Sequence, residues 1–414
     1  KTIWRDEMTE NSLFDMYSDV FGTLLFEPSL ISNDKDKETL ELLRAERETG
    51  LSRFACRTSE TRGRVHPEQP CNIRSCYERD MGRIIFSQSF RRLRHKTQVF
   101  FNPSNDHICS RIEHVIYVNY ISTIIGRALN LNIDLIQAIA MGHDIGHAPF
   151  GHTGEKVISK CMQDIDKDLF FEHEKQSLRV LDVLEEHREG EYGLNLTFEV
   201  RDGIVSHCGE TYDERTLSPR RDKTFDMVSS KTKKDGMAPA TLEGCVVRFA
   251  DKIAYVGRDV EDAFRAGIVS GYDSMPKEVI ERLGSSNAET INVLVGDIIH
   301  SSLDSDMISI SEGNFQAMNE FLHGNVEKIY RAKKISTYEK TVKLVVEGLF
   351  EAFYECCSDI EKAMASENDM IRKFAKFCMK HPEKDCPDAV KVADYISGMT
   401  DNFANTCFDS IYRV

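Results

Sequence analysis

Apolar residues recur every three or four positions along most of the chain. The clearest example is segment 111–131, where isoleucine and valine side chains fall on one face of a helix. Alternating apolar and polar residues are rare, and 96–101 (KTQVFF) is the best candidate for a short strand. The pattern therefore predicts an all-α protein. The other expected helices span 135–144, 173–187, 241–267 and 337–357.

The helix expected over 135–144 has recognisable ends. Asn132 or Asp134 can accept a hydrogen bond from the free N–H groups of its first turn. Gly146 ends it, because glycine readily leaves the helical conformation. A histidine-rich segment therefore starts at a helix terminus.

A polar segment over 209–240 separates two of the helical stretches. It is too long for a plain connector within a compact domain, so we expect either a mobile lid or a disordered loop. In the simpler interpretation its cationic side chains form a solvated surface, and in the other they grip phosphate or an effector. These side chains are Arg220, Arg221, Lys223, Lys231, Lys233 and Lys234.

The composition is that of a folded protein rather than a disordered one, with 41% hydrophobic and 29% charged residues. The formal net charge of -15 argues against a general nucleic-acid binder, because phosphate backbones bind clustered lysine and arginine. A small phosphorylated substrate stays compatible if a local basic cluster or a metal binds it. No apolar run is long enough for a membrane span and no signal-peptide pattern is present, so we expect a cytoplasmic protein without membrane contact.

The 12 cysteines are scattered and form no C-x-x-C pair. We therefore expect reduced, mostly buried thiols, and the spacing argues against a structural zinc site. The pair His207–Cys208, in VSHCGE, resembles half of a metal site. Without a second pair, an ordinary helix end is the better interpretation.

Ionisable side chains are crowded into one short segment. The chain has only 13 histidines, yet three of them fall within ten positions. Imidazole and carboxylate groups together suit Mn, Fe, Zn or Mg. The segment AIAMGHDIGHAPFGHTGE contains His143, Asp144, His147, His152 and Glu155.

Two residues outside this segment can complete a metal site. His114 lies one turn after Arg111 on the same helical face, so that a ligand and a cation project together. Asp251 lies in an otherwise apolar helical turn, where a lone carboxylate is costly unless it is paired or bound to metal.

A second pattern begins at Asp251. Tyr255 and Asp259 follow at four-residue intervals, so the three side chains share one helical face. A phenol ring beneath a sugar and a carboxylate that accepts its hydroxyl proton would form a sugar site, whereas an exposed helix edge is the simpler alternative. Lys252 lies one position round the helix, from where it could reach a phosphate.

His114, the His143–Asp144 pair and Asp251 together resemble the HD superfamily of metal-dependent phosphohydrolases. Longer blocks resemble one branch of it, the deoxyguanosine-triphosphate triphosphohydrolase family, and they follow that family's order across about residues 60 to 410. The blocks are 78–100, 111–114, 142–155, 171–181, 239–267 and 394–404.

The fold implied by this resemblance is an HD-domain helical core with an additional C-terminal helical region. We expect an N-terminal arm over 1–59, the core over 60–275 and the C-terminal region over 276–414. The stretch 394–401 (DYISGMTD) is either plain apolar core or, as the resemblance implies, a segment that approaches the nucleotide pocket.

The resemblance also implies roles for individual residues. The metal ligands are His114, His143, Asp144 and Asp251. The catalytic set is His152 with Glu155, together with His147 at the α-phosphate and His173 as a candidate proton donor. The substrate-binding set is Arg111 at the α-phosphate, Lys252 at the outer phosphates, and Gln98, Tyr255 and Asp259 around the deoxyribose. Helix capping is the alternative for the His152–Glu155 pair and a helix start for His173, where many members carry another residue.

The implied activity is hydrolysis of deoxynucleoside triphosphates, dGTP or a broader set, at the α-phosphorus to deoxynucleoside and triphosphate. It requires one divalent metal, with Mn or Mg favoured over Fe or Zn, and serves the control of nucleotide pools. The resemblance further implies a homo-oligomer and, by analogy, a nucleotide or single-stranded DNA effector. The alternatives are another HD phosphohydrolase, such as a 5′-nucleotidase or guanosine-tetraphosphate hydrolase, and a catalytically silent nucleotide-sensing or DNA-binding regulator.

Overall fold

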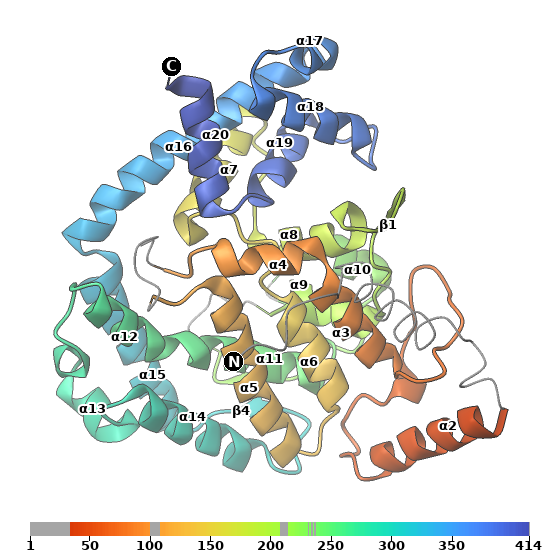
Figure 1. Cartoon of the computed structure of the whole chain (residues 1–414). Helices are drawn as coiled ribbons and strands as arrows, with labels where there is room; N and C mark the ends of the chain where they lie inside the picture. The colour runs from red at the N-terminus through yellow and green to blue at the C-terminus, as the bar shows by residue number, and fades with distance from the viewer. Residues whose placement is uncertain are drawn as a thin grey trace, which may run out of the picture.

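The computed structural model describes residues 34–99, 108–207, 214–230, 232, 235 and 237–413. Helices dominate these residues, and each strand is two or three residues long (Figure 1). The prediction of an all-α protein is confirmed. No described helix combines the length and the apolarity needed to cross a membrane.

Three helices form the centre of the molecule: α5 (Arg111–Ala128), α6 (Ile133–Gly142) and α11 (Leu242–Val256). α5 packs against both α6 and α11, and the aliphatic side chains between them are buried. α3 (Cys76–Phe86) and α9 (Phe198–Val205) pack on α6. Each fully buried leucine or isoleucine contributes roughly 1.5–3 kcal/mol, so this core holds firmly the helices that carry the ionisable residues.

The N-terminus of α6 is capped as the sequence predicts. The side chain of Asn132 accepts the N–H of Leu135 at 3.3 Å. Asp134, the alternative cap, accepts a hydrogen bond from the Ser75 hydroxyl instead.

The C-terminal helices form a second apolar core together with α7 (Gly151–Ile165). α16 (Lys333–Cys357) packs along α7 and also contacts α18 (Asp369–Lys380), α19 (Asp388–Ser397) and α20 (Asp401–Tyr412) (Figure 1, blue). Because α7 begins inside the histidine-rich segment, this core connects the C-terminal helices to the ionisable cluster.

Shorter elements complete the fold. The helical ones are α2 (Asp34–Thr49), η2 (Thr58–Glu60), α4 (Gln88–Arg92), η3 (Leu93–His95), α8 (His173–Arg179), η4 (Val180–Leu184), α10 (Phe225–Ser230), α12 (Arg258–Arg265), η6 (Tyr272–Ser274), α13 (Lys277–Leu283), α14 (Asn287–Ser302), α15 (Glu312–Asn325), η7 (Val326–Tyr330) and α17 (Ile360–Met364). The strands form two antiparallel pairs, β1 (Glu186–Arg188) with β2 (Glu191–Tyr192) and β3 (Thr216–Leu217) with β4 (Ile308–Ser309).

The strand expected over 96–101 is not formed within its described part. The N–H of Lys96 closes the η3 turn on the carbonyl of Leu93, so it cannot join a ladder. Only Thr97 pairs, through an isolated antiparallel bridge to Ser110. Residues 100 and 101 lie outside the described part of the chain.

Four predicted helices end earlier than the sequence indicates. The helix expected over 111–131 ends at Ala128, and the one expected over 135–144 ends at Gly142, so the prediction that Gly146 ends it is wrong. In the helix expected over 173–187, the α-helical part ends at Arg179, and the π-helical turn η4 follows it. No helix continues beyond η4, because the carbonyls of Leu181 and Glu185 accept the N–H groups of Leu194 and Gly193 instead. The helix expected over 241–267 divides at Gly257 into α11 and α12. A Cβ atom at this glycine would lie 2.2 Å from the Tyr272 hydroxyl, so the close packing there requires glycine.

The segment 209–240 is more ordered than a lid or a disordered loop where it is described. It contains β3 and α10, and three of its basic side chains are paired rather than free to grip phosphate. Lys223 is buried against Asp202, while Arg220 and Arg221 pair with acidic partners at the surface. Lys231, Lys233 and Lys234 lie outside the described residues.

The described cysteines are free thiols. Cys109, Cys245, Cys386 and Cys407 are buried, whereas the others in the described part of the chain are half-buried. The expectation of mostly buried thiols is therefore wrong, because most of the half-buried cysteines pack against the margin of one of the two cores, which covers them only in part.

Candidate active site

Side chains from three helical elements converge where α6 ends. His114 projects from α5 and Asp251 from α11, and His143 with Asp144 directly follows α6. Nε2 of His114 lies 2.9 Å from Oδ1 of Asp251 and 3.8 Å from Oδ2 of Asp144. Nε2 of His143 lies 3.6 Å from Oδ1 of Asp144 and 3.9 Å from Oδ1 of Asp251. The four residues that the sequence suggests as metal ligands therefore lie together.

The orientation of His143 fits a metal ligand. Its Nδ1 donates to the carbonyl of Ala140 at 2.7 Å, which leaves the lone pair on Nε2. This Nε2 is buried, faces the two carboxylates and has no hydrogen-bond partner among the described residues. A buried nitrogen acceptor beside two carboxylates and a second imidazole is the donor set that a divalent cation takes.

The electrostatics of the site favour ionised carboxylates. Burial alone would raise the pKa of Asp144, but His147, Arg111 and His143 together hold it well below its usual range. The closest of these contacts is a 2.7 Å ion pair with the Arg111 guanidinium. For Asp251, burial is likewise outweighed by the hydrogen bond from His114, and its pKa falls to about 2. Metal ligands must be deprotonated, so both groups are in the required state at neutral pH.

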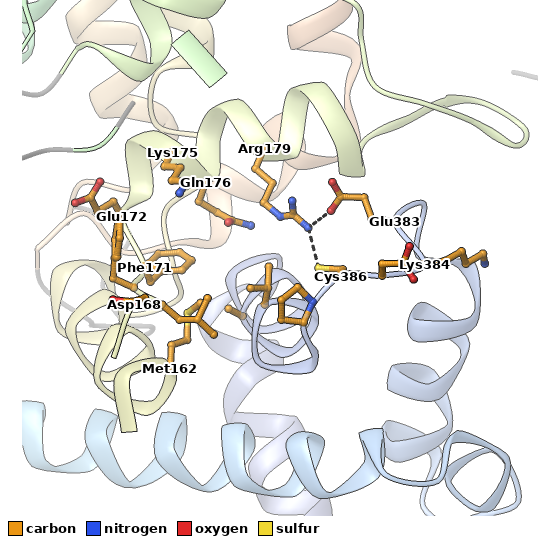
Figure 2. A pocket seen from close by; sticks show the side chains of 16 residues that line it. Met162, Asp168, Phe171, Glu172, Lys175, Gln176, Arg179, Glu383, Lys384 and Cys386 are labelled. Carbon is orange, nitrogen blue, oxygen red and sulfur yellow. Dashed lines mark hydrogen bonds and ion pairs between the residues drawn. The ribbon is translucent and has the colours of Figure 1, made fainter. Parts of the chain in front are cut away.

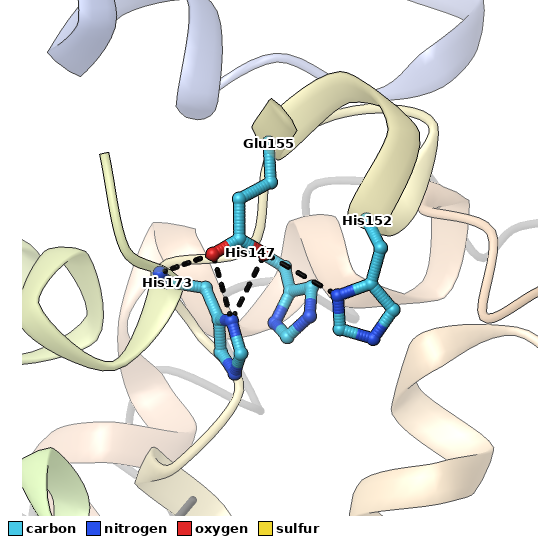
Figure 3. Close-up of side chains that lie close together, drawn as sticks. All are labelled: His147, His152, Glu155 and His173. Carbon is cyan, nitrogen blue, oxygen red and sulfur yellow. Dashed lines mark hydrogen bonds and ion pairs between the residues drawn. The ribbon is translucent and has the colours of Figure 1, made fainter. Parts of the chain in front are cut away.

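A second cluster lies beside the first and is centred on Glu155 (Figure 3). Its carboxylate accepts the backbone N–H of His173 at 3.1 Å and lies 3.0 Å from Nδ1 of the same residue. Nδ1 of His152 lies 3.3 Å from the same carboxylate. Glu155 and His173 are buried, whereas 60% of the His152 side chain is exposed. His152 can therefore meet a ligand from solvent while Glu155 holds its ring.

His147 connects the two clusters. Its ring centroid lies 3.8 Å from that of His173, and its Nδ1 lies 3.0 Å from Oδ1 of Asp144. Burial and the nearby Arg111 guanidinium lower the pKa of His147 well below its usual range, so the ring is neutral at pH 7.

His207 belongs to the same group of histidines, although the sequence indicates only an ordinary helix end. Its Nδ1 donates to the Ile204 carbonyl at 2.6 Å, and its ring lies 4.9 Å from that of His143 and 5.4 Å from that of His173. Burial lowers the pKa of His207 to about 4. Helix α9 before it is buried along its whole length, including its charged residues Glu199, Arg201 and Asp202, so no apolar pattern in the sequence signals that this end is buried. Cys208 lies outside the described residues.

Lys252, expected at the outer phosphates, and Gln98, expected at the deoxyribose, are close to these clusters. The Lys252 ammonium group is nearly buried and lies 3.6 Å from the Glu214 carboxylate. The carbonyl of Gln98 accepts the Arg111 guanidinium at 3.2 Å, and the side-chain oxygen of Gln98 is buried without a hydrogen-bond partner among the described residues.

Asp259 lies in the interior and not on an exposed helix edge. Only 2% of it is exposed, burial raises its pKa to about 7, and the Tyr330 hydroxyl donates to its carboxyl group. Tyr255 is half-buried on the preceding turn. Tyr330 belongs to η7, far along the chain, and no sequence pattern pointed to it.

Two comparisons with known proteins bear on this arrangement. The model of the HD domain matches residues 111–256, and that of the phosphohydrolase-associated domain matches 308–410. Deoxyguanosinetriphosphate triphosphohydrolase-like proteins match most of the chain. The one from Caldanaerobacter subterraneus is 38% identical over 87% of this chain and 92% of its own length. Those from Desulfatibacillum aliphaticivorans and Clostridium perfringens are 39% and 36% identical, each over 87% of this chain and 94% of their own length.

The chain belongs to the deoxyguanosinetriphosphate triphosphohydrolase-like family. It is thus an HD-domain phosphohydrolase, and HD domains bind divalent metals. The HD match begins at Arg111 and includes the two histidine clusters and Asp251.

Another polar cluster lies beside a cavity of about 550 Å³ between α8 and the C-terminal helices (Figure 2). His381, Cys386 and Asp394 lie close enough together to suggest a metal site. However, the Arg179 guanidinium already pairs with Asp394 at 2.7 Å and contacts the Cys386 sulfur. Nδ1 of His381 accepts the N–H of Glu383, so its Nε2 carries the proton that it donates to Asp394. The cluster is an ion-pair network in which arginine supplies the cation.

Proposed function

We propose that the protein hydrolyses deoxynucleoside triphosphates at the α-phosphorus, giving a deoxynucleoside and inorganic triphosphate. Water forms the new bond to phosphorus, and the bond from phosphorus to the 5′-oxygen breaks with a proton delivered to that oxygen. The observation that carries the proposal is the contact between the two clusters, through His147, in a chain of this family.

We propose His114, His143, Asp144 and Asp251 as the ligands of one divalent ion, with Mn or Mg favoured. The fit of His143 Nε2 and the ionised state of both carboxylates support this assignment. When bound, such an ion polarises a phosphoryl oxygen and lowers the pKa of a bound water.

Three side chains are proposed to bind the phosphates. Arg111 and His147 lie beside Asp144, where the α-phosphate would approach the metal ligands. Lys252 follows Asp251 on α11, so its ammonium group would meet the outer phosphates. These groups offset the repulsion between a polyphosphate and the ligand carboxylates.

The Glu155 cluster is proposed to transfer protons. His152 combines an exposed ring with a fixed carboxylate partner, which suits a group that must reach both substrate and solvent. His173 is buried against the same carboxylate, from where it would support the acid or act as the proton donor itself.

A sugar site is proposed at Gln98, Tyr255 and Asp259. The carboxyl group of Asp259 accepts a hydrogen bond from the Tyr330 hydroxyl and is almost fully buried. Such a pair of polar groups in buried surroundings suits recognition of a sugar hydroxyl. Because a site with buried polar partners discriminates strongly against ligands that leave them unpaired, this region is the expected source of selectivity for the sugar.

A 5′-nucleotidase, a guanosine-tetraphosphate hydrolase and a silent regulator are the competing functions. No specific contact among the described residues favours any of them over the proposed reaction. The homo-oligomer and the nucleotide or single-stranded DNA effector stay predictions, and neither is needed for the proposed chemistry.

Product identification tests the proposal. The purified protein is incubated with each dNTP and each ribonucleotide, with Mn or Mg, and the products are separated by anion-exchange chromatography. Triphosphate and a deoxynucleoside in equal amounts are the expected products. Free phosphate, pyrophosphate with a monophosphate, or no turnover with any nucleotide would contradict the proposal.

A further inference from the structure

The carboxylate of Asp401 lies between two chain segments that meet at the candidate active site. Oδ2 accepts the backbone N–H of Thr97 and Oδ1 that of Phe150, each at 2.9 Å. Asp401 is in the first turn of α20 and is 3% exposed. One buried carboxylate therefore holds two peptide groups from segments distant in sequence.

The first of these segments leads to Arg111. The carbonyl of Thr97 accepts a hydrogen bond from Nε of Arg111 at 3.4 Å. Thr97 also forms a β-bridge to Ser110, which directly precedes Arg111 in the chain. Fixing the Thr97 peptide thus fixes the backbone and the guanidinium of Arg111, which pairs with Asp144.

The second segment leads to His152. Phe150 has a left-handed backbone with φ of +64°, which costs a residue other than glycine roughly 1–2 kcal/mol. Gly151 follows with φ of +60°, and then α7 carries His152. The hydrogen bond to Asp401 holds the N–H of Phe150 in this unfavourable turn.

The two segments also touch each other at this junction. A Cβ atom on Gly151 would lie 3.2 Å from the carbonyl oxygen of Gln98, so only glycine fits without displacing that peptide. Lys96 reinforces the junction, because its buried ammonium group donates to the carbonyls of His147 and Ser397. A shift of either segment is therefore transmitted to the other.

We propose that Asp401 is a positioning residue, whose carboxylate sets the distance between Arg111 and His152. Both bonds are charge-assisted, and each oxygen serves one segment. The kinetic part of this inference rests on the proposed function, whereas the structural part does not. It also gives the C-terminal helices a direct role at the site, since Asp401 enters it from α20.

Asp401→Asn is the direct test, because the side-chain volume is kept while one acceptor oxygen becomes an NH₂ group that opposes a backbone N–H. Asp409→Asn, the same substitution at a half-buried surface position of α20 where the carboxylate pairs with Arg413 at the same helix end, is the matched control. Hydrogen exchange is measured by mass spectrometry on peptides that contain Thr97 or Phe150, and kcat and KM are measured with a dNTP. Asp401→Glu keeps the charge but moves the oxygens, and serves as a second variant should Asp401→Asn fail to fold.

For Asp401→Asn we expect faster exchange in both peptides and a kcat lower by roughly tenfold to a hundredfold, with KM changed by less than about threefold. Asp401→Glu should fall between it and the wild type, and Asp409→Asn should match the wild type. Unchanged exchange, or an unchanged kcat in the folded variant, would overturn the inference. If the wild type turned over no dNTP, the proposed function would fail, and the exchange result alone would uphold or overturn the positioning by Asp401.

Discussion

Glu155 and His173 are joined twice, through the backbone N–H of His173 at 3.1 Å and through its Nδ1 at 3.0 Å. The same carboxylate lies 3.3 Å from Nδ1 of the exposed His152. One acid therefore orients a buried and an exposed histidine at once. Burial would raise the pKa of Glu155, but the two histidines, His173 foremost, hold it well below its usual range.

Glu155→Gln should lower kcat by about a hundredfold, because oriented proton transfer contributes roughly 10²–10⁴-fold. Glutamine keeps the size of the side chain but loses the charge that fixes both imidazole rings. Steady-state kinetics with a dNTP provides the measurement, and Glu278→Gln on an exposed part of α13 is the matched control. If kcat were the same in both variants, the Glu155 cluster would have no part in proton transfer.

Gly151→Ala and Gly190→Ala form a second matched pair. Both glycines have positive φ, at +60° and +76°, so each substitution should cost about 1 kcal/mol of stability. Only at Gly151 does the new Cβ meet another peptide, the Gln98 carbonyl at 3.2 Å; at Gly190 nothing lies within 4 Å. Thermal unfolding should therefore shift in both variants, and further in Gly151→Ala because of this contact, while kcat falls in Gly151→Ala alone. Equal kcat values in both would show that the turn before His152 does not need its present shape.

His143→Ala should remove bound metal and activity together. The substitution deletes the Nε2 atom that faces Asp144 and Asp251. Metal content is measured by mass spectrometry after dialysis against limiting Mn, beside His187→Ala, a histidine outside the cluster. A stoichiometric metal content in His143→Ala would refute the proposed ligand set.

The stability of the metal-free protein should depend on pH through Asp259. Burial raises the pKa of this group to about 7, so the folded protein keeps a proton that the unfolded chain releases near pH 4. The contribution of Asp259 to stability is thus complete below about pH 4 and falls by up to about 1.4 kcal/mol per pH unit as the pH rises towards 7.

Asparagine cannot titrate, so Asp259→Asn should lose this dependence. Urea unfolding at pH 5, 6, 7 and 8 should show the variant gaining stability relative to the wild type as the pH rises. Asp273→Asn, at an exposed position, serves as the control. A difference between Asp259→Asn and the wild type that stays constant across this range would contradict the raised pKa.

Sequence patterns located those parts of the site whose residues are near one another in the chain. His143 and Asp144 are adjacent, and Asp251 and Tyr255 share a face of one helix, so helical periodicity and the family resemblance were enough to group them. His207 and Tyr330 are not assigned to the site from the sequence, because only tertiary packing brings them there. Asp401 ends the stretch 394–401 that the resemblance brings towards the pocket, but the two peptide groups that it binds are known only from the structure. Nothing in their local sequence states which distant segment they meet.

For the fold as well, local features could be predicted from the sequence, whereas features set by contacts between distant residues could not. The cap at Asn132 and the start of the helix at 111 follow from local propensities, and the structure has both where the pattern indicates, although the helix ends at Ala128 rather than 131. The division at Gly257 depends on Tyr272 approaching from another element, and the early end of α8 depends on the returning residues 193 and 194. Long-range contacts of this kind override periodicity and cannot be derived from it.

The most direct test of the proposed reaction is hydrolysis of a dNTP in ¹⁸O-labelled water, with mass analysis of both products. Attack at the α-phosphorus with cleavage of its bond to the 5′-oxygen predicts one labelled oxygen in the triphosphate and none in the deoxynucleoside. A labelled deoxynucleoside, or label appearing in free phosphate or a nucleotide product, would contradict the account.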